Sequence, residues 1–319
     1  MSDLICCGAI NWDINLFVDR LPRTGEEVKV KEIQRVSGGT AANVAVAAAR
    51  ILGPSRVSLI GSLGCDEIAE KQLQILISEG VDYSGILKID GEESGQAYIT
   101  ISSNGENEIH TFFGANLKLA PERIEDRERL SLIFGSKIIV IMDPPLETAE
   151  KLAKISKENG KTVIWDPGVY SGYELKKLTP TIMNVDYFVL NNLEFQNLLG
   201  TNDPKEIIQS MSQVKRGIKV IIKEGDRGST LLGDGGALTI HVDAVRLSKL
   251  GMEIVNTVGC GDAFIGAFAA AKVEELDDTE ALRLGNVAGS FKATRKETRG
   301  GPTRAQLYEL MARLSEVDK

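Results

Sequence analysis

The 319-residue sequence predicts an α/β protein with a doubly wound, mostly parallel central sheet, helices on both faces and a small β-sheet lid. Short apolar runs of strand length alternate along the chain with amphipathic stretches of helical spacing, an order typical of parallel sheets. Two regions have extended segments with no helix between them, which indicates a second, smaller sheet. No repeat, low-complexity tract or linker divides the sequence, so we expect one domain over residues 1–319.

The expected strands of the central sheet are continuous apolar runs, as strands buried on both faces should be. They cover residues 4–9, 57–60, 138–142, 162–165, 187–190 and 220–222. Helices are expected over 44–52, 66–79 and 146–159, the last two followed by glycines that can end them, and the region 261–311 is expected to be mostly helical.

The lid is expected from two discontinuous segments, residues 14–37 and 94–113. Both contain extended, alternating stretches. The second includes Ser103-Asn104-Gly105-Glu106, and an Asn-Gly pair between two extended runs is typical of a tight β-hairpin. A small sheet of this kind can project from the main domain and cover a site.

Composition excludes several classes of function. The net charge is −8 and no basic run is interleaved with aromatic residues, so no nucleic-acid partner is expected. No stretch reaches the ~18 apolar residues of a membrane span, and the N-terminus lacks a basic lead and cleavage site, which favours a cytoplasmic protein. The four cysteines and two histidines show no metal-binding spacing, and buried, reduced thiols are expected.

The strongest chemical signal is the segment from Asn256 to Phe264, which precedes a helix of small and apolar residues. Gly259 and Gly261 permit a tight turn that brings backbone N–H groups together at a helix N-terminus, a site that suits a phosphate. Asp262 lies at the same helix start and can accept a proton from an attacking hydroxyl. A helix cap after a glycine turn would use the same residues.

Two further segments strengthen this interpretation. Ser37 to Asn43 contains the pair Gly38-Gly39 and opens a helix that is almost all Ala and Val, and Asn43 can offer an amide donor and a carbonyl acceptor to a polyol. Asn11-Trp12-Asp13 follows the first strand, where ligands of doubly wound sheets bind, and a carboxylate there can accept two hydroxyl hydrogen bonds. In isolation, each could be an ordinary turn.

Taken together and in this chain order, the motifs resemble the ribokinase-like, or phosphofructokinase-B-type, carbohydrate kinases, a family that includes sugar and nucleoside kinases. The resemblance covers nearly the whole chain. It rests on the opening 8–13, the two signatures 38–45 and 257–264, the Asn-x-x-Glu segment 191–194 and the glycine turn 225–228.

The resemblance implies transfer of a phosphoryl group from ATP or ADP to a hydroxyl of a sugar or nucleoside, with Mg²⁺ as cofactor. Asp262 would be the base, and Gly259, Cys260 and Gly261 would form an anion hole. The residues implied to bind the acceptor are Asn11, Asp13, Gly38, Gly39, Asn43, Phe113, Asn116 and Asp143. Those implied on the nucleotide side are Asn191, Lys223, Gly225, Gly228, Thr257 and Asn286, with Glu194 at the metal. A homodimer through the lid is also implied.

Some residues depart from the family pattern. Asn256 stands where an aspartate near a monovalent-cation site is usual, so potassium dependence is in doubt. Lys223 and Cys260 replace the usual small residues, and Thr40 stands where ribokinases carry a lysine, so ribose itself is not favoured as the acceptor.

Alternatives remain open at this point. A nucleoside kinase or a sugar-phosphate kinase of the same family is consistent with the aromatic residues near the lid, and a non-catalytic sugar-binding protein would retain the same motifs. A dehydrogenase is disfavoured because the first strand is not followed by a Gly-x-Gly-x-x-Gly turn.

Overall fold

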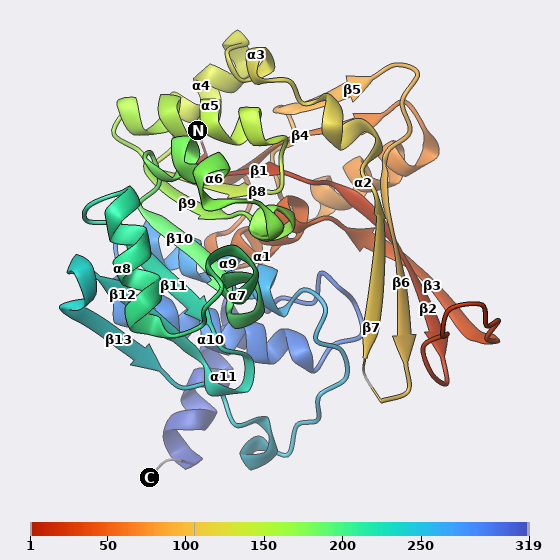
Figure 1. Ribbon diagram of the computed structural model, residues 1–319. Helices are drawn as coiled ribbons and strands as arrows, with labels where there is room; N and C mark the ends of the chain where they lie inside the picture. Colours follow the sequence, from red (N-terminus) through yellow and green to blue (C-terminus); the bar gives the residue numbers. More distant parts are fainter. Residues whose placement is uncertain (1, 105, 318–319) are drawn as a thin grey trace.

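The computed structural model describes residues 2–104 and 106–317, which form two β-sheets and surrounding helices (Figure 1). Within the described chain the larger sheet has nine strands in the order β13-β12-β11-β10-β9-β8-β1-β4-β5. These strands are β1 (Leu4–Gly8), β4 (Val57–Gly64), β5 (Ile86–Ile89), β8 (Ile138–Met142), β9 (Thr162–Asp166), β10 (Tyr187–Asn191), β11 (Lys219–Lys223), β12 (Ser229–Gly233) and β13 (Leu238–Val242).

The sheet is parallel from β5 across to β11, and β12 and β13 continue it in antiparallel fashion. β1 pairs with β4 on one side and with β8 on the other. Its five residues are all buried. The chain reverses strand order on either side of β1, and such a point in a doubly wound sheet is where ligands bind.

Helices cover both faces of this sheet, as the burial of alternate β1 residues requires. Leu4 and Cys6 belong to a core with helices α1, α2, α9, α10 and α11, whereas Ile5 and Cys7 belong to a second core with α3 to α8. The first group is α1 (Thr40–Leu52), α2 (Glu67–Ser78), α9 (Cys260–Val273), α10 (Asp278–Ala293) and α11 (Arg304–Val317). The second is α3 (Pro121–Ile124), α4 (Arg127–Gly135), α5 (Leu146–Glu158), α6 (Leu175–Ile182), α7 (Asn192–Leu199) and α8 (Pro204–Val214).

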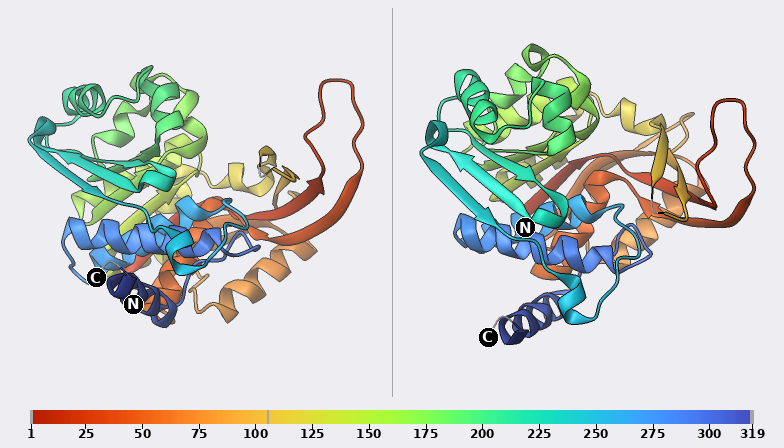
Figure 2. Two further views of the ribbon diagram at one scale, coloured as in Figure 1. Left: turned by 90° about the horizontal axis from the view of Figure 1, so that it is seen from below. Right: turned by 60° about the horizontal axis from the view of Figure 1, so that its bottom comes forward.

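The smaller sheet is the lid, with strand order β3-β2-β6-β7. Its strands are β2 (Asn11–Val18), β3 (Val30–Gly38), β6 (Gly95–Ser102) and β7 (Asn107–Phe112). Figure 2 shows this sheet projecting from the body of the molecule, with the β2–β3 ribbon extending farthest. β2 follows β1 almost directly, after a bend at Gly8 with φ 144°.

The central strands and the main helices lie where the sequence predicts them, and the sheet is mostly parallel as expected. The first lid strand starts at Asn11, three residues before the expected boundary, because Asn11 to Asp13 are extended rather than a turn. The antiparallel pairing of β6 with β7 agrees with the predicted hairpin, although Gly105 of its turn lies outside the described residues.

The four cysteines differ in burial. Cys6 and Cys7 are buried, but Cys65 is exposed and Cys260 is half-buried, so the expectation of buried thiols is wrong for Cys65. In the part of the chain that the structure describes, every helix is too short or too polar to cross a membrane.

Candidate active site

The start of α9 has the shape of an anion-binding site. Gly259 precedes the helix with φ 85°, and a side chain there would place its Cβ only 2.3 Å from the Thr298 carbonyl oxygen. Only glycine fits this position. No side chain caps the helix in the described chain. The Cys260 N–H donates to the Thr257 carbonyl over 3.2 Å, whereas the N–H groups of Gly261 and Asp262 have no partner among the described residues, and the helix dipole adds positive potential there.

Asp262 lies in this first turn and is held from the side by two other segments. Asn43, in the first turn of α1, donates from Nδ2 to Asp262 Oδ2 over 2.8 Å. Arg299 in turn donates from Nε to Asn43 Oδ1 over 2.9 Å and from Nη2 to the Gly38 carbonyl and to Gln72 Oε1, while its Nη1 has no partner in the described residues. Burial raises the pKa of Asp262 to about 6, while the Asn43 hydrogen bond and the Lys223 ammonium oppose that rise. A carboxyl with this pKa is a competent base near neutral pH.

Asp13 comes to the same region from β2. Its carboxylate sits directly over Gly38, where any Cβ would lie 2.1 Å from it. Asp13 is buried, and burial raises its pKa to about 7 despite the nearby Arg299 guanidinium. Gly39, with φ 90°, lets α1 begin against the backbone of Asn11. The predicted grouping of Asp13, the glycine pair, Asn43 and Asp262 is therefore present.

Two more carboxylates follow the ends of β8 and β9. Asp143, with φ 57°, accepts a hydrogen bond from Thr40 Oγ1 over 3.0 Å and one from the Val169 N–H. Burial raises its pKa to about 7, and the neighbouring Asp166 adds to the rise. Asp166 is itself buried and accepts from the Gly168 N–H over 3.0 Å.

Lys223, the last residue of β11, places a positive charge among these carboxylates. Its ammonium donates to Asp166 and lies 3.5 Å from where a Cβ at Gly261 would be. Burial alone would lower the pKa of Lys223, but Asp166, Glu194 and Asp262 outweigh it and the pKa is raised. A buried cation thus stands beside the start of α9, where it can meet phosphate oxygens.

Glu194 lies in the first turn of α7, next to Lys223. Asn191 and Glu194 form a reciprocal cap in which the Asn191 N–H donates to Glu194 Oε2 over 2.7 Å and the Glu194 N–H donates to Asn191 Oδ1 over 2.9 Å. Burial raises the pKa of Glu194, and Lys223 opposes the rise. Its second oxygen, Oε1, is left for another partner.

The donor set here fits Mg²⁺ bound mainly through phosphates. The described residues hold no cluster of three or more His, Cys, Asp or Glu side chains that would form a protein cage for a metal. Mg²⁺ beside a nucleotide commonly uses one or two carboxylates and several waters, which is what Glu194 can supply.

The expected nucleotide side is a group of turns beyond β11. Gly228, with φ 102°, packs so tightly on the 242–244 segment that a Cβ would lie 2.1 Å from the Val242 carbonyl. Asn286 of α10 donates to that same carbonyl over 2.7 Å. Gly225 opens the turn with φ 64°, and Thr257 is exposed just before the α9 start.

Asn11 and Asn116 bind each other rather than pointing freely into the site. Asn116 donates to Asn11 Oδ1 over 2.8 Å and accepts from the Ile10 N–H over 2.9 Å. Asn116 also donates to the carbonyl of Phe113, whose residue is half-buried. These contacts fix the base of the lid next to β1, and they engage the amide of Asn116 and the Oδ1 of Asn11.

The structure adds residues that the sequence prediction did not assign to the site. Asp166 ends a buried strand, and from the sequence a site role and a turn role are equally open for it. Arg299 lies in an irregular loop 256 residues away from Asn43 in sequence, and no local signal marks it. Asn15, two residues after Asp13 on the same face of β2, is buried, and neither of its amide atoms has a partner in the described chain.

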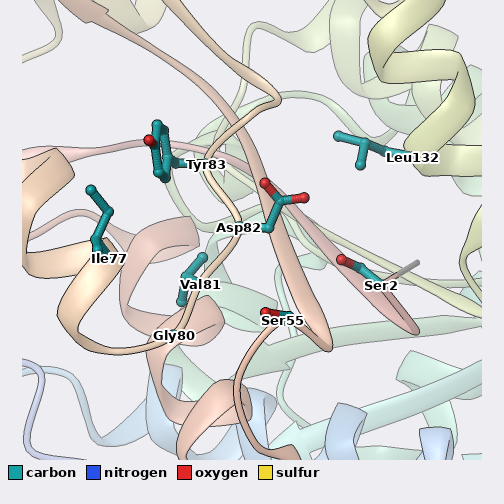
Figure 3. Close-up of a pocket in the computed structure, with 8 residues that line it drawn as sticks. All are labelled: Ser2, Ser55, Ile77, Gly80, Val81, Asp82, Tyr83 and Leu132. Atoms are coloured by element: carbon teal, nitrogen blue, oxygen red, sulfur yellow. The ribbon is translucent and has the colours of Figure 1, made fainter.

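A separate surface pocket lies at the opposite, amino end of the central strands (Figure 3). It has a volume of about 400 Å³ and is lined by Ser2, Ser55, Ile77, Gly80, Val81, Asp82, Tyr83 and Leu132. Asp82 already accepts hydrogen bonds from Ser58 Oγ and the Ser84 N–H. The start of α9, after Gly259, is therefore the better candidate for the active site.

Comparisons with known proteins show the family to which the chain belongs. The profile of the pfkB family of carbohydrate kinases matches residues 1–304. The chain is 29% identical over 303 residues to an ATP-dependent ribose-1-phosphate kinase of Halopiger xanaduensis, covering 95% of this chain and 96% of the relative. It is 30% identical over 299 residues to a ribokinase of Arabidopsis thaliana, covering 90% of this chain and 75% of the relative.

Solved structures show the same fold. The structure of Arabidopsis thaliana ribokinase complexed with ribose and ATP superimposes with a TM-score of 0.84 at 28% identity, covering 98% of this chain and 99% of that one. Giardia lamblia ribokinase gives a TM-score of 0.87 at 24% identity, covering 97% and 99% of the two chains. The chain therefore belongs to the pfkB family of carbohydrate kinases, and it is a phosphotransferase whose acceptor is an alcohol group.

Proposed function

We propose that this kinase transfers the terminal phosphoryl group of ATP to a hydroxyl of a pentose or a pentose derivative. The observation that carries the proposal is the position of Asp262: it lies in the first turn of α9, bound to Asn43 and next to the Gly261 N–H, which has no partner in the described chain. The relatives named ribokinase and ATP-dependent ribose-1-phosphate kinase support ATP as the donor and a pentose framework for the acceptor.

In this mechanism Asp262 accepts the proton of the acceptor hydroxyl as the hydroxyl oxygen attacks the γ-phosphorus. The bond from that phosphorus to the β–γ bridging oxygen breaks, and ADP leaves. Asn43 keeps the carboxylate oriented, and its hydrogen bond favours the ionised form. Asp13 and the Gly38–Gly39 backbone hold other hydroxyls of the acceptor. Position, more than covalent chemistry, provides the rate enhancement of phosphoryl transfer.

The charge of the transferred phosphoryl group is met by the α9 N–H groups and by Lys223. Because the Lys223 ammonium lies beside Gly261, it can leave Asp166 in part and contact a phosphate oxygen. Mg²⁺ would neutralise phosphate charge when bound, and Glu194 would hold it through water. Asn191, Gly225, Gly228, Thr257 and Asn286 would surround the rest of the nucleotide.

The lid would close over the acceptor and, with its other face, contact a second copy of the chain. Strand register puts Trp12, Ile14 and Leu16 on the face opposite Asp13, together with Ile33, Tyr98 and Phe112, which are 49%, 42% and 48% exposed. An apolar face of this kind supports the homodimer. A monomeric mass in light scattering at micromolar concentration would argue against it.

An acceptor larger than a free pentose has one specific observation in its favour. The side-chain amide of the buried Asn15 has no partner in the described residues, and it lies two residues after Asp13 on the inner face of the lid. Asn15 is paired in register with Gln34, whose Oε1 also has no partner among those residues. Buried amides without partners are costly, and a polar group on the far end of the acceptor would satisfy them. A phosphorylated sugar or a nucleoside provides such a group.

The proposal is tested by measuring nucleotide turnover with ribose, deoxyribose, ribose 1-phosphate and nucleosides, each with ATP and with ADP. We expect turnover with ATP and one pentose-containing acceptor, no product with ADP, and a product phosphorylated on oxygen. Absence of turnover with every acceptor, in enzyme that binds ATP normally, would contradict the proposal.

A further inference from the structure

Lys292 is a buried cation that the mechanism above does not use. It lies one residue before the end of α10, and its exposed fraction is 0%. In the described chain its ammonium makes two hydrogen bonds, both to backbone carbonyl oxygens: 2.9 Å to Asn256 and 3.3 Å to Arg295. A buried ammonium held by carbonyl oxygens, without a directly bonded carboxylate, is unusual, because burying a charge is expensive.

The surroundings show how this charge is tolerated. The C-terminal end of α10 contributes the negative end of its helix dipole. Burial lowers the pKa of Lys292, whereas Cys260, Glu297 and Asp262 act in the opposite direction. The side chain fits its channel closely, since a Cβ at Gly300 would lie 2.9 Å from Lys292 Cδ. The protein therefore encloses a single positive charge of ammonium size in a fixed place.

That place lies between the two loops that build the catalytic centre. One loop, residues 255–259, leads into α9, and the other, 294–300, follows α10. Asn256 donates from Nδ2 to the Lys296 carbonyl over 2.8 Å and accepts from the Val258 N–H over 3.0 Å. The Val255 N–H donates to the Ala293 carbonyl over 2.7 Å. The Lys292 ammonium bonds to one carbonyl oxygen of each loop, and among the described residues it is the only charged side chain that does so.

Both loops position groups that act on substrate. The 255–259 loop sets the turn at Gly259, and the 294–300 loop supplies the Thr298 carbonyl against that glycine and Arg299 against Asn43. A change in the spacing of the two loops would therefore move the anion hole and Asp262 relative to Asn43.

We propose that Lys292 is a built-in monovalent cation: it holds the two loops at the spacing that catalysis needs, so this kinase requires no free monovalent cation. Lys292 is thus a positioning residue. A free K⁺ or NH₄⁺ carries the same charge and is also coordinated by carbonyl oxygens, so removing the side chain should leave a place that such an ion can fill. Only the kinetic part of this inference rests on the proposed function.

The test compares Lys292→Ala, which opens the site, with Lys292→Met, which fills it without charge. Lys215→Met is the matched control, because Lys215 also donates to a backbone carbonyl, that of Val185, but at the amino end of the sheet. Turnover of the acceptor selected by the screen above is measured with K⁺, NH₄⁺, Na⁺ or tetramethylammonium as the sole monovalent cation, and melting temperature is measured in the same salts.

We expect the unmodified enzyme and Lys215→Met to be insensitive to the cation. Both Lys292 variants should lose about a hundredfold in kcat with little change in acceptor KM, the cost of misplacing reacting groups by roughly an ångström. K⁺ or NH₄⁺ should restore at least tenfold to Lys292→Ala and raise its melting temperature, whereas tetramethylammonium should do neither, and Lys292→Met should not respond.

Three results would overturn the proposal: strong activation of the unmodified enzyme by K⁺, normal kcat in Lys292→Met, or a folded Lys292→Ala that responds to no cation in kcat or melting temperature. If Lys292→Ala fails to fold in every one of these salts, the proposal is decided by the kcat of Lys292→Met and by the cation response of the unmodified enzyme. If no acceptor is ever phosphorylated, the proposed function fails, yet the melting response of Lys292→Ala still shows whether a cation replaces the ammonium.

Discussion

The start of α9 and the lid are held in different ways. Around α9, side chains from distant segments bind one another: Asp262 is tied to Asn43, Asn43 to Arg299, and Lys223 to Asp166. In the lid, β7 has five exposed residues among its six, and the buried Asn15 has no partner in the described chain. The side chains near α9 hold one another in place, which favours fixed chemistry, and within this network Arg299 Nη1 alone of the named groups has no partner in the described residues. A sheet with an unpartnered buried amide and exposed apolar side chains is suited to bind a ligand or a second chain. We therefore expect changes near α9 to lower kcat and changes in the lid to alter acceptor binding.

The largest effect should come from Asp262→Asn. The amide keeps the shape of the side chain but cannot accept the proton, so kcat should fall roughly 10³-fold with little change in acceptor KM. Initial rates with saturating ATP measure it, and a melting temperature close to that of the unmodified protein serves as the control. Near-normal turnover in the folded variant would remove Asp262 as the base.

Lys223→Met should have the next largest effect. It removes the cation beside Gly261, so phosphoryl-group charge is less well stabilised and kcat should fall about a hundredfold, with a higher KM for ATP. Lys219→Met is a matched control, because Lys219 lies at the other end of the same strand and pairs with Asp278. Equal loss in both variants would show that the effect is structural.

Asn43→Ala should move the pH dependence of the reaction. Burial raises the pKa of Asp262 to about 6, and the Asn43 hydrogen bond opposes that rise, so its removal should raise the pKa further. Since the base acts when ionised, the acidic limb of kcat/KM for the acceptor should shift to higher pH, with a loss of up to about tenfold near pH 7. The pH profiles of the unmodified enzyme and of Asn43→Ala are recorded in parallel, because the titration of ATP affects both equally and cancels in the comparison. A limb that stays in place or moves to lower pH would be inconsistent with this contact.

The smallest effect should come from the lid variant Asn15→Leu. Replacing an unpartnered buried amide with an apolar group of similar size should leave the melting temperature unchanged or higher. The KM for the acceptor should nevertheless rise about three- to tenfold if the amide binds it, with kcat nearly unchanged. An unchanged KM would show that Asn15 does not contact the acceptor.

Sequence patterns predict the body of the molecule better than its edges, for a physical reason. Buried strands such as Ile138–Met142 are apolar runs that local composition reveals, and glycines after the helices mark their ends. The predicted strands of the central sheet do not include β5, β12 and β13, because short strands towards the edges of a sheet are specified by their pairing rather than by composition. The start of β2 at Asn11 was missed because a polar Asn-Trp-Asp run resembles a turn locally.

The same distinction holds at the site. Gly259, Asp262 and the Gly38–Gly39 pair stand next to a helix start, so their role is visible in a few consecutive residues. Arg299 and Lys292 act through carbonyl and amide groups that only the fold brings near them, and nothing in their sequence neighbourhood distinguishes them from surface residues. Lys223 was predicted on the nucleotide side, but its contact with Asp166 required the structure.

A crystal structure with a non-hydrolysable ATP analogue and the acceptor tests the central claim most directly. We predict that the acceptor hydroxyl lies within about 2.6–3.2 Å of an Asp262 oxygen, with the terminal phosphate at the N–H groups of residues 259–261. A terminal phosphate bound elsewhere, or a reacting hydroxyl that faces a group other than Asp262, would contradict it.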